Sequence, residues 1–415
     1  MIKALYKYTP PSVKRAYKLI KYSTKHIKQT AIISDTPTKQ SKERFLLFAY
    51  VEQVNKINTI AETVDELIKH SKYSIDWVNM YPSLTLSKDF MFHHYDGIII
   101  HNSTNYFIEG FLGIDRVCKQ KITDFKGLKI MFKQDEHYRH YLFIDYLERN
   151  PFNLIITGRP PDMVNDFYPA DRIPNTSFLQ ALTSYVNKTQ RELPYKDIRN
   201  RKIDVGYRGS PQPLISGRQG YEKRQIGWEF EKYGSKRNLT TDISSEWDKR
   251  IFGDKWYEFL GNCKSILSVE SGASIADIDG SVEREYNNYV KLHPKAGDEE
   301  ILDFLSKFES DIHARVIAPR HFQAAACFTV QVMYEDDFQG IFKKHEHYIV
   351  LNRDFSNVDE VIDKILDEKE RERITKNAYK DIIMNDIYSY SFFVKRFDNA
   401  INKLLAGTDK RKIFE

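Results

Sequence analysis

Two arginines stand close to the start of an alanine-rich segment in the last third of the chain. Arg315 and Arg320 precede Phe322-Gln-Ala-Ala-Ala-Cys327, and a short β-branched run, Val330–Met333, follows. This order predicts a loop, a helix of small side chains and a strand. The N-terminus of such a helix has unpaired N–H groups that suit an anion. The segment is therefore either an anion-binding site or a tightly packed core helix, and the residues alone leave both interpretations open.

Polar groups also follow two predicted strands in the same half of the chain. Arg208-Gly-Ser-Pro211 comes after one strand, and Glu270 with the turn Ser271-Gly-Ala-Ser274 comes after another. Parallel sheets bind ligands at the carboxyl ends of their strands. Arginine forks match diphosphate oxygens, and a Ser/Gly turn exposes backbone N–H groups to them. Glu270 is predicted either to bind sugar or ribose hydroxyls or to pair with a buried arginine.

In the first half of the chain the predicted strand ends bring a different chemistry. His101 follows one strand, and Asp135 and Glu136 follow another. A carboxylate or an imidazole at that edge can deprotonate or orient a hydroxyl group. Asp135 can instead cap the helix predicted to begin near Tyr138, or bind an acceptor.

Metal ligation is a weaker interpretation of two further pairs. His137 and His140 are spaced three apart, but no cysteine or acidic set completes a site around them. Asp277 and Asp279 lie in one turn, where carboxylates usually act as caps, and the dense oxygen spacing of a calcium loop is missing. We expect no metal and no other cofactor.

The order of motifs in the last 100 or so residues carries a family resemblance. The runs, in chain order, are Pro319–Cys327, Glu346–Val350, Asn357–Leu366 and Arg371–Ala378. Their order and spacing resemble the C-terminal half of bacterial glycosyltransferases of the spore-maturation CgeB type, and residues 200–290 resemble that group more loosely. These enzymes are relatives of the nucleotide-sugar transferases with the GT-B fold. The resemblance implies a nucleotide-sugar donor bound to the C-terminal half.

Two positions depart from the pattern of that group. Members usually carry a glutamate that holds the donor ribose where this chain has Gln323, and often a second acidic residue where it has Arg315. A glutamine amide still hydrogen-bonds a diol but carries no charge. The departure leaves the donor nucleotide open.

Strands alternating with helices predict two doubly wound, Rossmann-like domains. The predicted organisation is a basic amphipathic helix and linker at 1–40, an acceptor-side domain at 41–195, a nucleotide-sugar-binding domain at 196–385, and a C-terminal helix at 386–415 that packs back on the first domain. The strands expected in the first domain are at 44–51, 74–79, 96–101, 126–132 and 152–157, and those in the second at 203–207, 265–270, 330–333 and 347–351.

Composition describes a globular protein with a large core. Of the 415 residues 41% are hydrophobic, and no apolar run is long enough to cross a membrane. The three cysteines, Cys118, Cys263 and Cys327, lie far apart, which favours a reducing cytoplasm over a disulfide framework.

The net charge of +5 is concentrated at the N-terminus, where eight lysines and arginines precede the first acidic residue, Asp35. Residues 11–31 have helical spacing of apolar residues, with one apolar and one cationic face. This pattern is typical of a helix on an anionic membrane surface, and equally of a helix docked on its own domain. A continuing basic stripe is missing, so we expect no nucleic-acid partner.

Taken together, these features predict a metal-independent GT-B glycosyltransferase that moves a sugar to a glycan or lipid-linked acceptor in bacterial surface polysaccharide assembly, at the inner face of the cell membrane. The predicted catalytic residues are Asp135, Glu136 and His101. The predicted donor-binding residues are Arg208, Glu270, Ser271, Gly272, Ala273, Ser274, Arg315, Arg320, His321 and Gln323. The alternatives are a nucleotide-sugar epimerase of the same architecture, and a non-catalytic protein that binds a glycan or a partner.

Overall fold

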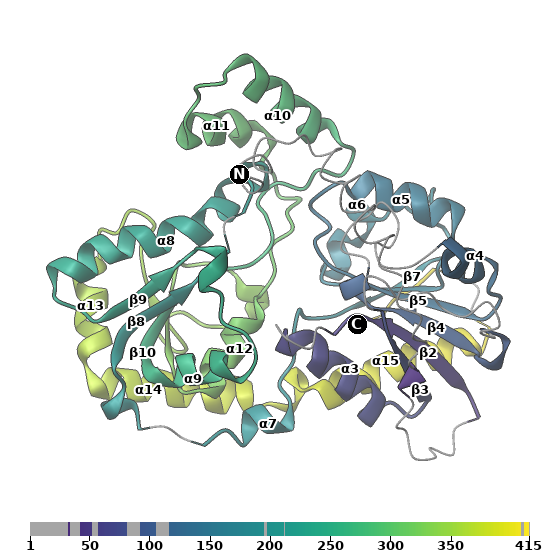
Figure 1. Ribbon diagram of the computed structural model, residues 1–415, viewed down its shortest axis with the longest axis horizontal. Coiled ribbons are helices and arrows are strands. Elements are labelled where there is room, and N and C mark those ends of the chain that lie inside the picture. Colours follow the sequence, from purple (N-terminus) through teal and green to yellow (C-terminus); the bar gives the residue numbers. More distant parts are fainter. Residues whose placement is uncertain are drawn as a thin grey trace.

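The computed structural model describes residues 32–33, 42–51, 57–80, 92–104, 116–194, 197–210, 212–407 and 411–414. The chain forms two α/β domains that lie side by side, with the C-terminal helices running beneath both (Figure 1). The basic segment 1–31 and the linker predicted at 36–41 lie outside the described residues.

The first domain is built on an eight-stranded sheet in the order β1-β3-β2-β4-β5-β6-β7-β13. All described pairs are parallel except β1 with β3. The strands are β1 Ile32–Ile33, β2 Arg44–Ala49, β3 Ser74–Asn79, β4 Gly97–Ile100, β5 Leu128–Lys133, β6 Leu154–Thr157, β7 Ser177–Gln180 and β13 Ile413–Phe414. The central strands are apolar runs such as Ile98–Ile100, because helices cover both faces of the sheet.

One face of this sheet packs against α3 (Asn58–His70) and α15 (Tyr390–Leu405). The other face packs against α4 (Arg116–Asp124), α5 (His140–Arg149) and α6 (Val164–Phe167). The helix α15 comes from the C-terminal end of the chain and lies along α3, where the Asp398 carboxylate accepts a hydrogen bond from the Ser71 hydroxyl at 2.7 Å. The end of the chain is thus part of the first domain (Figure 1).

The second domain has a five-stranded parallel sheet in the order β12-β11-β10-β8-β9. Its strands are β8 Ile203–Arg208, β9 Thr241–Ser244, β10 Cys263–Ser268, β11 Val330–Met333 and β12 Ile349–Val350. Its helices are α7 Lys188–Arg191 in the connection between domains, α8 Gly217–Lys236, α9 Asp254–Asn262, α12 Pro319–Ala326, α13 Val358–Leu366 and α14 Glu368–Ala378. Between β10 and α12 the chain forms a helical hairpin, α10 Ser281–Leu292 and α11 Asp298–Leu305, which stands above the gap between the domains (Figure 1).

The predicted class of two doubly wound, Rossmann-like domains is confirmed. The strand predicted at 265–270 begins and ends two residues earlier, so Glu270 lies beyond the strand. Helices α13 and α14 are separated at Asp367, whose side chain accepts hydrogen bonds from the backbone N–H groups of Lys369 and Glu370 and so starts α14. Strands β7 and β9 were not predicted, because both are short and contain polar residues.

In each sheet the order of the parallel strands reverses next to the parallel strand that comes first in the chain, β2 in the first sheet and β8 in the second. The reversal lies between β2 and β4 in the first sheet and between β8 and β10 in the second. Ligands of open α/β sheets bind outside the carboxyl ends of the strands at this point. The residues that follow β4, β5, β8 and β10 are therefore the positions where a ligand is expected to bind.

Candidate functional site

Two adjoining hollows lie between the domains at these strand ends. The first, of about 260 Å³, is lined mainly by the second domain and is called the C-side hollow. The second, of about 350 Å³, is lined mainly by the first domain and is called the N-side hollow. Both include Ile57, Thr59, Arg250, Ser271 and Pro319 in their walls, so they form one continuous cleft.

The N-terminus of α12 forms one wall of the C-side hollow. Pro319 occupies the first helical position, where its missing N–H costs nothing, and Arg320 and Gln323 follow on the lining face. The Arg320 guanidinium donates to the backbone oxygen of Arg208 at 2.7 Å and lies 5.6 Å from the ring centre of Tyr207. This contact uses one N–H group and leaves most of the fork of Arg320 for a ligand.

Arg208 also lines the C-side hollow, but the protein engages most of its donors. Nε donates to the backbone oxygen of Lys249 at 3.0 Å, and Nη1 donates to the backbone oxygens of Tyr207 and Asp242, each at 2.8 Å. Nη2 donates to the Asp242 carboxylate at 2.8 Å. With four of its five N–H groups used, Arg208 holds the ends of β8 and β9 together and keeps one donor for a ligand.

The turn after β10 lies where the two hollows meet. Ser271 lines both hollows, and Gly272 lines the N-side hollow with φ at 87°. A Cβ at Gly272 would lie 1.7 Å from the backbone oxygen of Ala314, so only glycine fits there. Ala273 and Ser274 are buried behind this turn and belong to neither wall.

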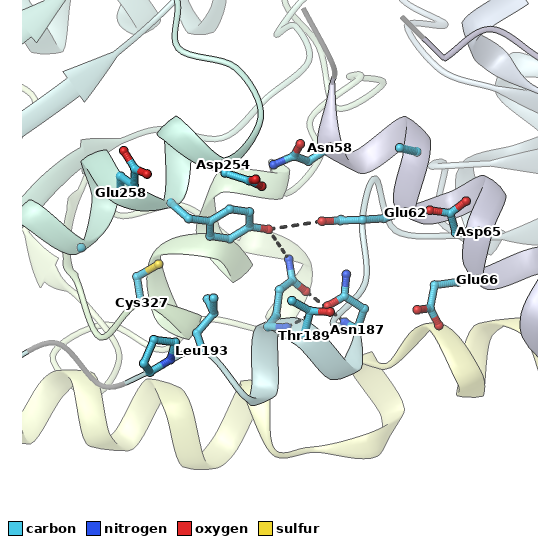
Figure 2. A pocket seen from close by; sticks show the side chains of 15 residues that line it. Asn58, Glu62, Asp65, Glu66, Asn187, Thr189, Leu193, Asp254, Glu258 and Cys327 are labelled. Carbon is cyan, nitrogen blue, oxygen red and sulfur yellow. Dashed lines mark hydrogen bonds between the residues drawn. The ribbon is translucent and has the colours of Figure 1, made fainter. Parts of the chain in front are cut away.

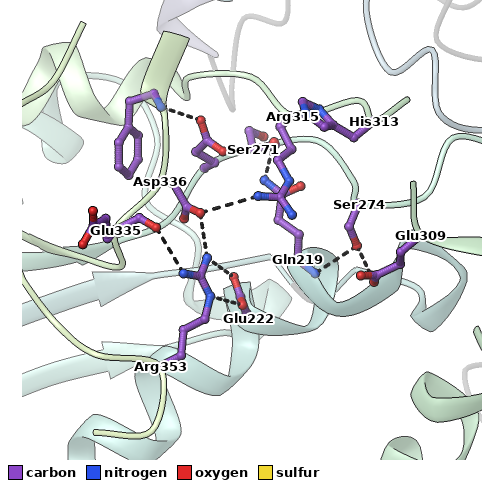
Figure 3. Close-up of polar contacts among 12 residues, drawn as sticks. Gln219, Glu222, Ser271, Ser274, Glu309, His313, Arg315, Glu335, Asp336 and Arg353 are labelled. Atoms are coloured by element: carbon purple, nitrogen blue, oxygen red, sulfur yellow. Dashed lines mark hydrogen bonds and ion pairs between the residues drawn. The ribbon is translucent and has the colours of Figure 1, made fainter. Parts of the chain in front are cut away.

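Glu270 and Arg315 line neither hollow, and Arg315 lies in a polar network with Asp336 and Arg353 (Figure 3). One Glu270 oxygen accepts a hydrogen bond from the Phe338 backbone N–H at 2.7 Å. Burial, together with the nearby Asp336, raises the pKa of Glu270 to about 7. Asp336 lies 3.6 Å from Arg315 and 2.7 Å from Arg353. The structure therefore places these two predicted donor-binding residues in the wall behind the turn.

His321 is fully buried and serves the start of α12. Its Nδ1 accepts from the Ala318 backbone N–H at 3.0 Å, and its Nε2 lies 3.1 Å from the Ser268 hydroxyl. Burial lowers the pKa of His321 to about 3, so the ring is neutral. Its contacts are with the protein, and it does not line either hollow.

Gln323 lines the C-side hollow with a fixed orientation. The indole N–H of Trp256 donates to Gln323 Oε1 at 2.8 Å. An indole nitrogen only donates, so the amide oxygen must face Trp256 and the amide NH₂ remains for the hollow. At the position predicted to hold the ribose, this protein presents a hydrogen-bond donor.

The sequence analysis missed two cationic residues near the cleft: Arg250 lines its walls, and Lys223 lies behind Ser271, outside the linings of both hollows. Lys223 reaches from the middle of α8 to the Ser271 hydroxyl, 3.2 Å away, and burial, with Arg320 nearby, lowers the pKa of its ammonium to about 8. Arg250 lines both hollows, with its guanidinium 4.7 Å from the ring centre of Trp247. Both lie within long polar stretches, where single basic residues give no local signal.

In the N-side hollow the two predicted carboxylates differ in environment. Asp135 is exposed, lines the hollow and has φ at 58°. Because α5 begins only at His140 and shows no side-chain cap, Asp135 is not its cap. Glu136 is buried, and one of its oxygens accepts from the Thr157 hydroxyl at 2.5 Å and the Tyr168 hydroxyl at 3.2 Å. Its other oxygen lies 3.7 Å from the Arg159 guanidinium.

Two histidines complete the N-side wall. Nδ1 of His101 is 2.9 Å from the Ser103 hydroxyl, and burial lowers the pKa of His101 to about 3. His137 was considered in the sequence only as a metal ligand, yet it lines the hollow, and its buried Nδ1 has no hydrogen-bond partner among the described residues. Both rings are therefore neutral groups available to hydroxyl groups of a ligand.

Two of the residues considered for metal binding, His140 and Asp277, are bonded to the backbone. His140 is buried and bonded to the backbone oxygen of Phe167 at 2.6 Å. Asp277 accepts from the backbone N–H groups of Val282 and Glu283 and thus caps α10. Within the described part of the chain, no three His, Cys, Asp or Glu residues are grouped as metal ligands.

A larger hollow of about 450 Å³ lies between α3, α7 and α9 (Figure 2). The Tyr257 hydroxyl bridges the domains there, 3.3 Å from Glu62 and 2.9 Å from Gln190. Five carboxylates line it, from Glu62, Asp65, Glu66, Asp254 and Glu258, and its described lining has no lysine or arginine. This charge is unsuited to a phosphate group.

A scan against protein-family models and a search of curated proteins found no match. Among solved structures, the chain is similar to an alpha-glucosyltransferase in complex with UDP, with 10% identity and a TM-score of 0.48 over 87% of this chain and 100% of that one. It is also similar to sucrose-phosphate synthase from Thermosynechococcus elongatus, with 12% identity and a TM-score of 0.48 over 88% and 100%. TarM matches at 12% identity and a TM-score of 0.43 over 84% and 59%. At these scores the matches carry no weight for substrate or mechanism.

The geometry by itself describes what the cleft can bind. The N-terminus of α12, Arg320 and Ser271 line the C-side, with Lys223 bonded to Ser271 from behind, and an anion would be held there. Asp135, His101 and His137 face the same cleft from the N-side, where hydroxyl groups would be oriented. No helix among the described residues is long and apolar enough to span a membrane.

Proposed function

We propose that this protein is a GT-B glycosyltransferase that uses a nucleoside-diphosphate sugar as donor. The observation that carries the proposal is the single cleft between two Rossmann-like domains, cationic on one side and carboxylate-bearing on the other. The diphosphate would bind at the N-terminus of α12, against Arg320 and the Ser271 turn. Gln323 lies one helical turn further on, about 4.5 Å along the helix axis, which suits the ribose.

The sugar would then extend from the Ser271 turn into the N-side hollow. There it would meet His137 and His101, both neutral, and an acceptor hydroxyl would approach Asp135. Transfer breaks the bond between the anomeric carbon and the diphosphate oxygen and forms a bond to the acceptor oxygen, while the acceptor proton passes to a base. Asp135 is the candidate base, because it is the exposed carboxylate of the cleft. Arg320 and Lys223 would stabilise the charge that develops on the leaving diphosphate.

A calorimetric and melting screen with UDP, GDP, dTDP and CMP tests this proposal. We expect one nucleoside diphosphate to bind and raise the melting temperature, because a ligand that binds only the folded state stabilises it by mass action. The matched nucleoside without phosphates should bind more weakly. Absence of binding by every nucleotide would contradict the proposal.

A donor-only assay separates glycosyl transfer from the alternative of an epimerase. An epimerase converts its nucleotide-sugar without any acceptor, whereas a transferase releases the nucleotide rapidly only when an acceptor hydroxyl is present. A protein that binds the nucleotide but neither releases it nor changes its sugar would be a non-catalytic binding protein. The glycosyltransferase activity that we propose requires that release of the nucleotide depend on the acceptor.

The finer assignment is to the CgeB-type group, with a glycan or lipid-linked acceptor in bacterial surface polysaccharide assembly. It is supported by the motif order in the C-terminal half and by the basic, amphipathic pattern of residues 11–31. We propose that residues 1–31 bind an anionic membrane surface, where each lysine or arginine contributes about 1 kcal/mol. Deleting them should release the protein from anionic vesicles while turnover of a soluble acceptor persists. Retained vesicle binding would contradict the membrane role.

A further inference from the structure

The side chain of Arg159 touches both sides of the cleft. Arg159 follows β6 in the first domain, and its side chain is 3% exposed. Its Nη1 donates to the backbone oxygen of His313 at 3.1 Å and its Nη2 to that of Ala314 at 3.4 Å, both in the second domain. Its Nε lies 3.7 Å from the Glu136 carboxylate of its own domain.

The carbonyl groups that Arg159 binds belong to residues 313–317, here called the linking loop. The backbones of Ser271 and Val316 exchange two hydrogen bonds, of 2.8 and 3.1 Å. The Ala314 N–H donates to the backbone oxygen of Ala273 at 3.0 Å, and Gly272 packs directly on the Ala314 oxygen. The linking loop is thus bonded to the turn proposed to hold the diphosphate.

On its other side Arg159 controls the charge of Glu136. Burial opposes ionisation of this carboxyl, but Arg159, then Lys133, outweigh the effect of burial, so that its pKa is lowered. The Arg159 backbone N–H also donates to the Thr157 hydroxyl at 3.1 Å, and that hydroxyl donates to Glu136. Glu136 follows Asp135 directly in the chain, and both residues line the N-side hollow.

We infer that Arg159 is a positioning residue that couples closure of the two domains to the arrangement of the carboxylates in the N-side hollow. This inference rests on the proposed function of the cleft. When the domains separate, Arg159 loses the two carbonyl acceptors of the linking loop, and a buried guanidinium without acceptors is costly. Closure restores both acceptors and holds Arg159 beside Glu136. The catalytic arrangement of the first domain is therefore complete only when the donor side is in place.

The test compares Arg159→Met with Thr183→Val. The Thr183 hydroxyl donates to the backbone oxygen of Ile317 at 2.6 Å, so its loss also removes a bond between the first domain and the linking loop, but it leaves Glu136 untouched. Arg159→Lys, which keeps the charge, is the variant to use if Arg159→Met fails to fold. Small-angle scattering of the ligand-free proteins should show a larger radius of gyration for Arg159→Met, with a smaller increase for Arg159→Lys.

Kinetic measurements then show whether Arg159 couples domain closure to the arrangement of the carboxylates or only holds the two domains together. Arg159→Met should lower kcat by about tenfold or more while the donor KM changes less, because it loses hydrogen bonds of a charged group that lies outside the lining of the C-side hollow, where the diphosphate is proposed to bind. The acid limb of its pH profile should move to higher pH, because the pKa of Glu136 rises without Arg159 and protonation of Glu136, next to the candidate base Asp135, then lowers activity at a higher pH. Arg159→Lys should restore part of kcat, and Thr183→Val should leave the acid limb in place. The other titratable groups that face Glu136 are kept in all variants: Lys133, His137, His140 and Tyr168.

Two results would overturn the inference. One is an Arg159→Met protein with the radius of gyration and pH profile of the parent. The other is a Thr183→Val protein with the same shift of the acid limb, which would make Arg159 one interdomain contact among others. If the parent protein itself transfers no sugar and binds no nucleotide, the proposed function fails, whereas the scattering comparison still decides whether Arg159 holds the domains together.

Discussion

The two sides of the cleft differ in the charged groups they offer. The described lining of the C-side hollow has three arginines and no carboxylate, whereas that of the N-side hollow has Asp135 and Glu136 beside two arginines, Arg159 and Arg250. A positive wall attracts a diphosphate and stabilises it as a leaving group, and a carboxylate accepts a proton from a hydroxyl. If the proposed function holds, donor binding falls to one domain and proton transfer to the other, and the two domains must meet for the reaction.

The two sides also share a principle of construction. In each, one charged side chain is bonded into the protein while a second charged group remains for a ligand. On the C-side, Arg208 is bonded to Asp242 and Lys249, whereas Arg320 keeps donors for a ligand. On the N-side, Glu136 is bonded to Thr157 and lies beside Arg159, whereas Asp135 is exposed. We expect the residues bonded into the protein to matter for stability and the others for function, and substitutions test this difference.

The largest effect is expected for the two carboxylates. Asp135→Asn should lower turnover by roughly 10²-fold, because the base is lost, while the Kd of the nucleotide stays near that of the parent. Glu136→Gln should instead lower the free energy of unfolding by about 3 kcal/mol, since it leaves the buried Arg159 without its charged partner. Turnover assays and urea unfolding of both variants check this. An active Asp135→Asn protein beside an inactive, fully stable Glu136→Gln protein would exchange the two roles.

The strands could be predicted from the sequence where burial produces a run of apolar residues. Strands β3 (Ser74–Asn79) and β11 (Val330–Met333) were predicted to the residue. The rule of strand ends also brought Ser271, Arg320, His101 and Asp135 to one cleft. Local patterns do not reveal which polar groups the protein itself engages. The donors of Arg208 go to residues 34 and 41 positions away, and Lys223 meets Ser271 only because α8 crosses the end of β10.

The second prediction compares the two arginines of the C-side hollow. Arg320→Ala should weaken nucleoside diphosphate binding by about 1.5 to 3 kcal/mol, because a charged hydrogen-bonding partner is removed from a site that already has the helix N-terminus. Arg208→Ala should weaken it less and lower the melting temperature more, since four of its N–H groups bind the protein. Calorimetry with the nucleoside and its mono- and diphosphates, together with melting curves, measures both effects. A large loss of diphosphate affinity in a fully stable Arg208→Ala protein would restore the role predicted from the sequence.

The third prediction concerns pH on the cationic side. The pKa of Lys223 is lowered to about 8 from an ordinary value near 10.5. At a pH between these two values, Lys223 is therefore deprotonated in the folded protein and protonated in the unfolded chain. Stability therefore rises with pH across that window, and the ammonium is lost from the cleft as pH rises through 8. Diphosphate affinity should fall by about tenfold between pH 7 and pH 9, because the protonated fraction falls by that factor. In Lys223→Met the affinity should be lower at pH 7 and nearly independent of pH over this range. An unchanged slope would assign the pH dependence to another group.

The smallest effect on nucleotide binding is expected at Gln323, an uncharged residue of the C-side hollow. Trp256 fixes Gln323 so that its NH₂ group faces the hollow, and the ligand atom beside it must be an acceptor, such as a ribose oxygen. Gln323→Glu would present an acceptor there instead and would favour ligand groups that donate. We expect a change of about 0.5 to 1.5 kcal/mol in binding of a nucleoside diphosphate, with the nucleoside affected equally, because the contact is to the ribose and not to the phosphates.

The matched variant is Trp256→Phe, which keeps an aromatic ring beside the amide and removes the N–H that fixes it. Freed to rotate, the Gln323 amide can offer either its oxygen or its nitrogen to the ribose. The parent should therefore distinguish a ribonucleotide from its 2′- and 3′-deoxy analogues differently from Gln323→Glu, and Trp256→Phe should lie between the two. Calorimetry of the three proteins with the three nucleotides gives the comparison directly. If all three proteins rank the nucleotides in the same way, the ribose lies away from Gln323 and the C-side hollow holds the donor in another orientation.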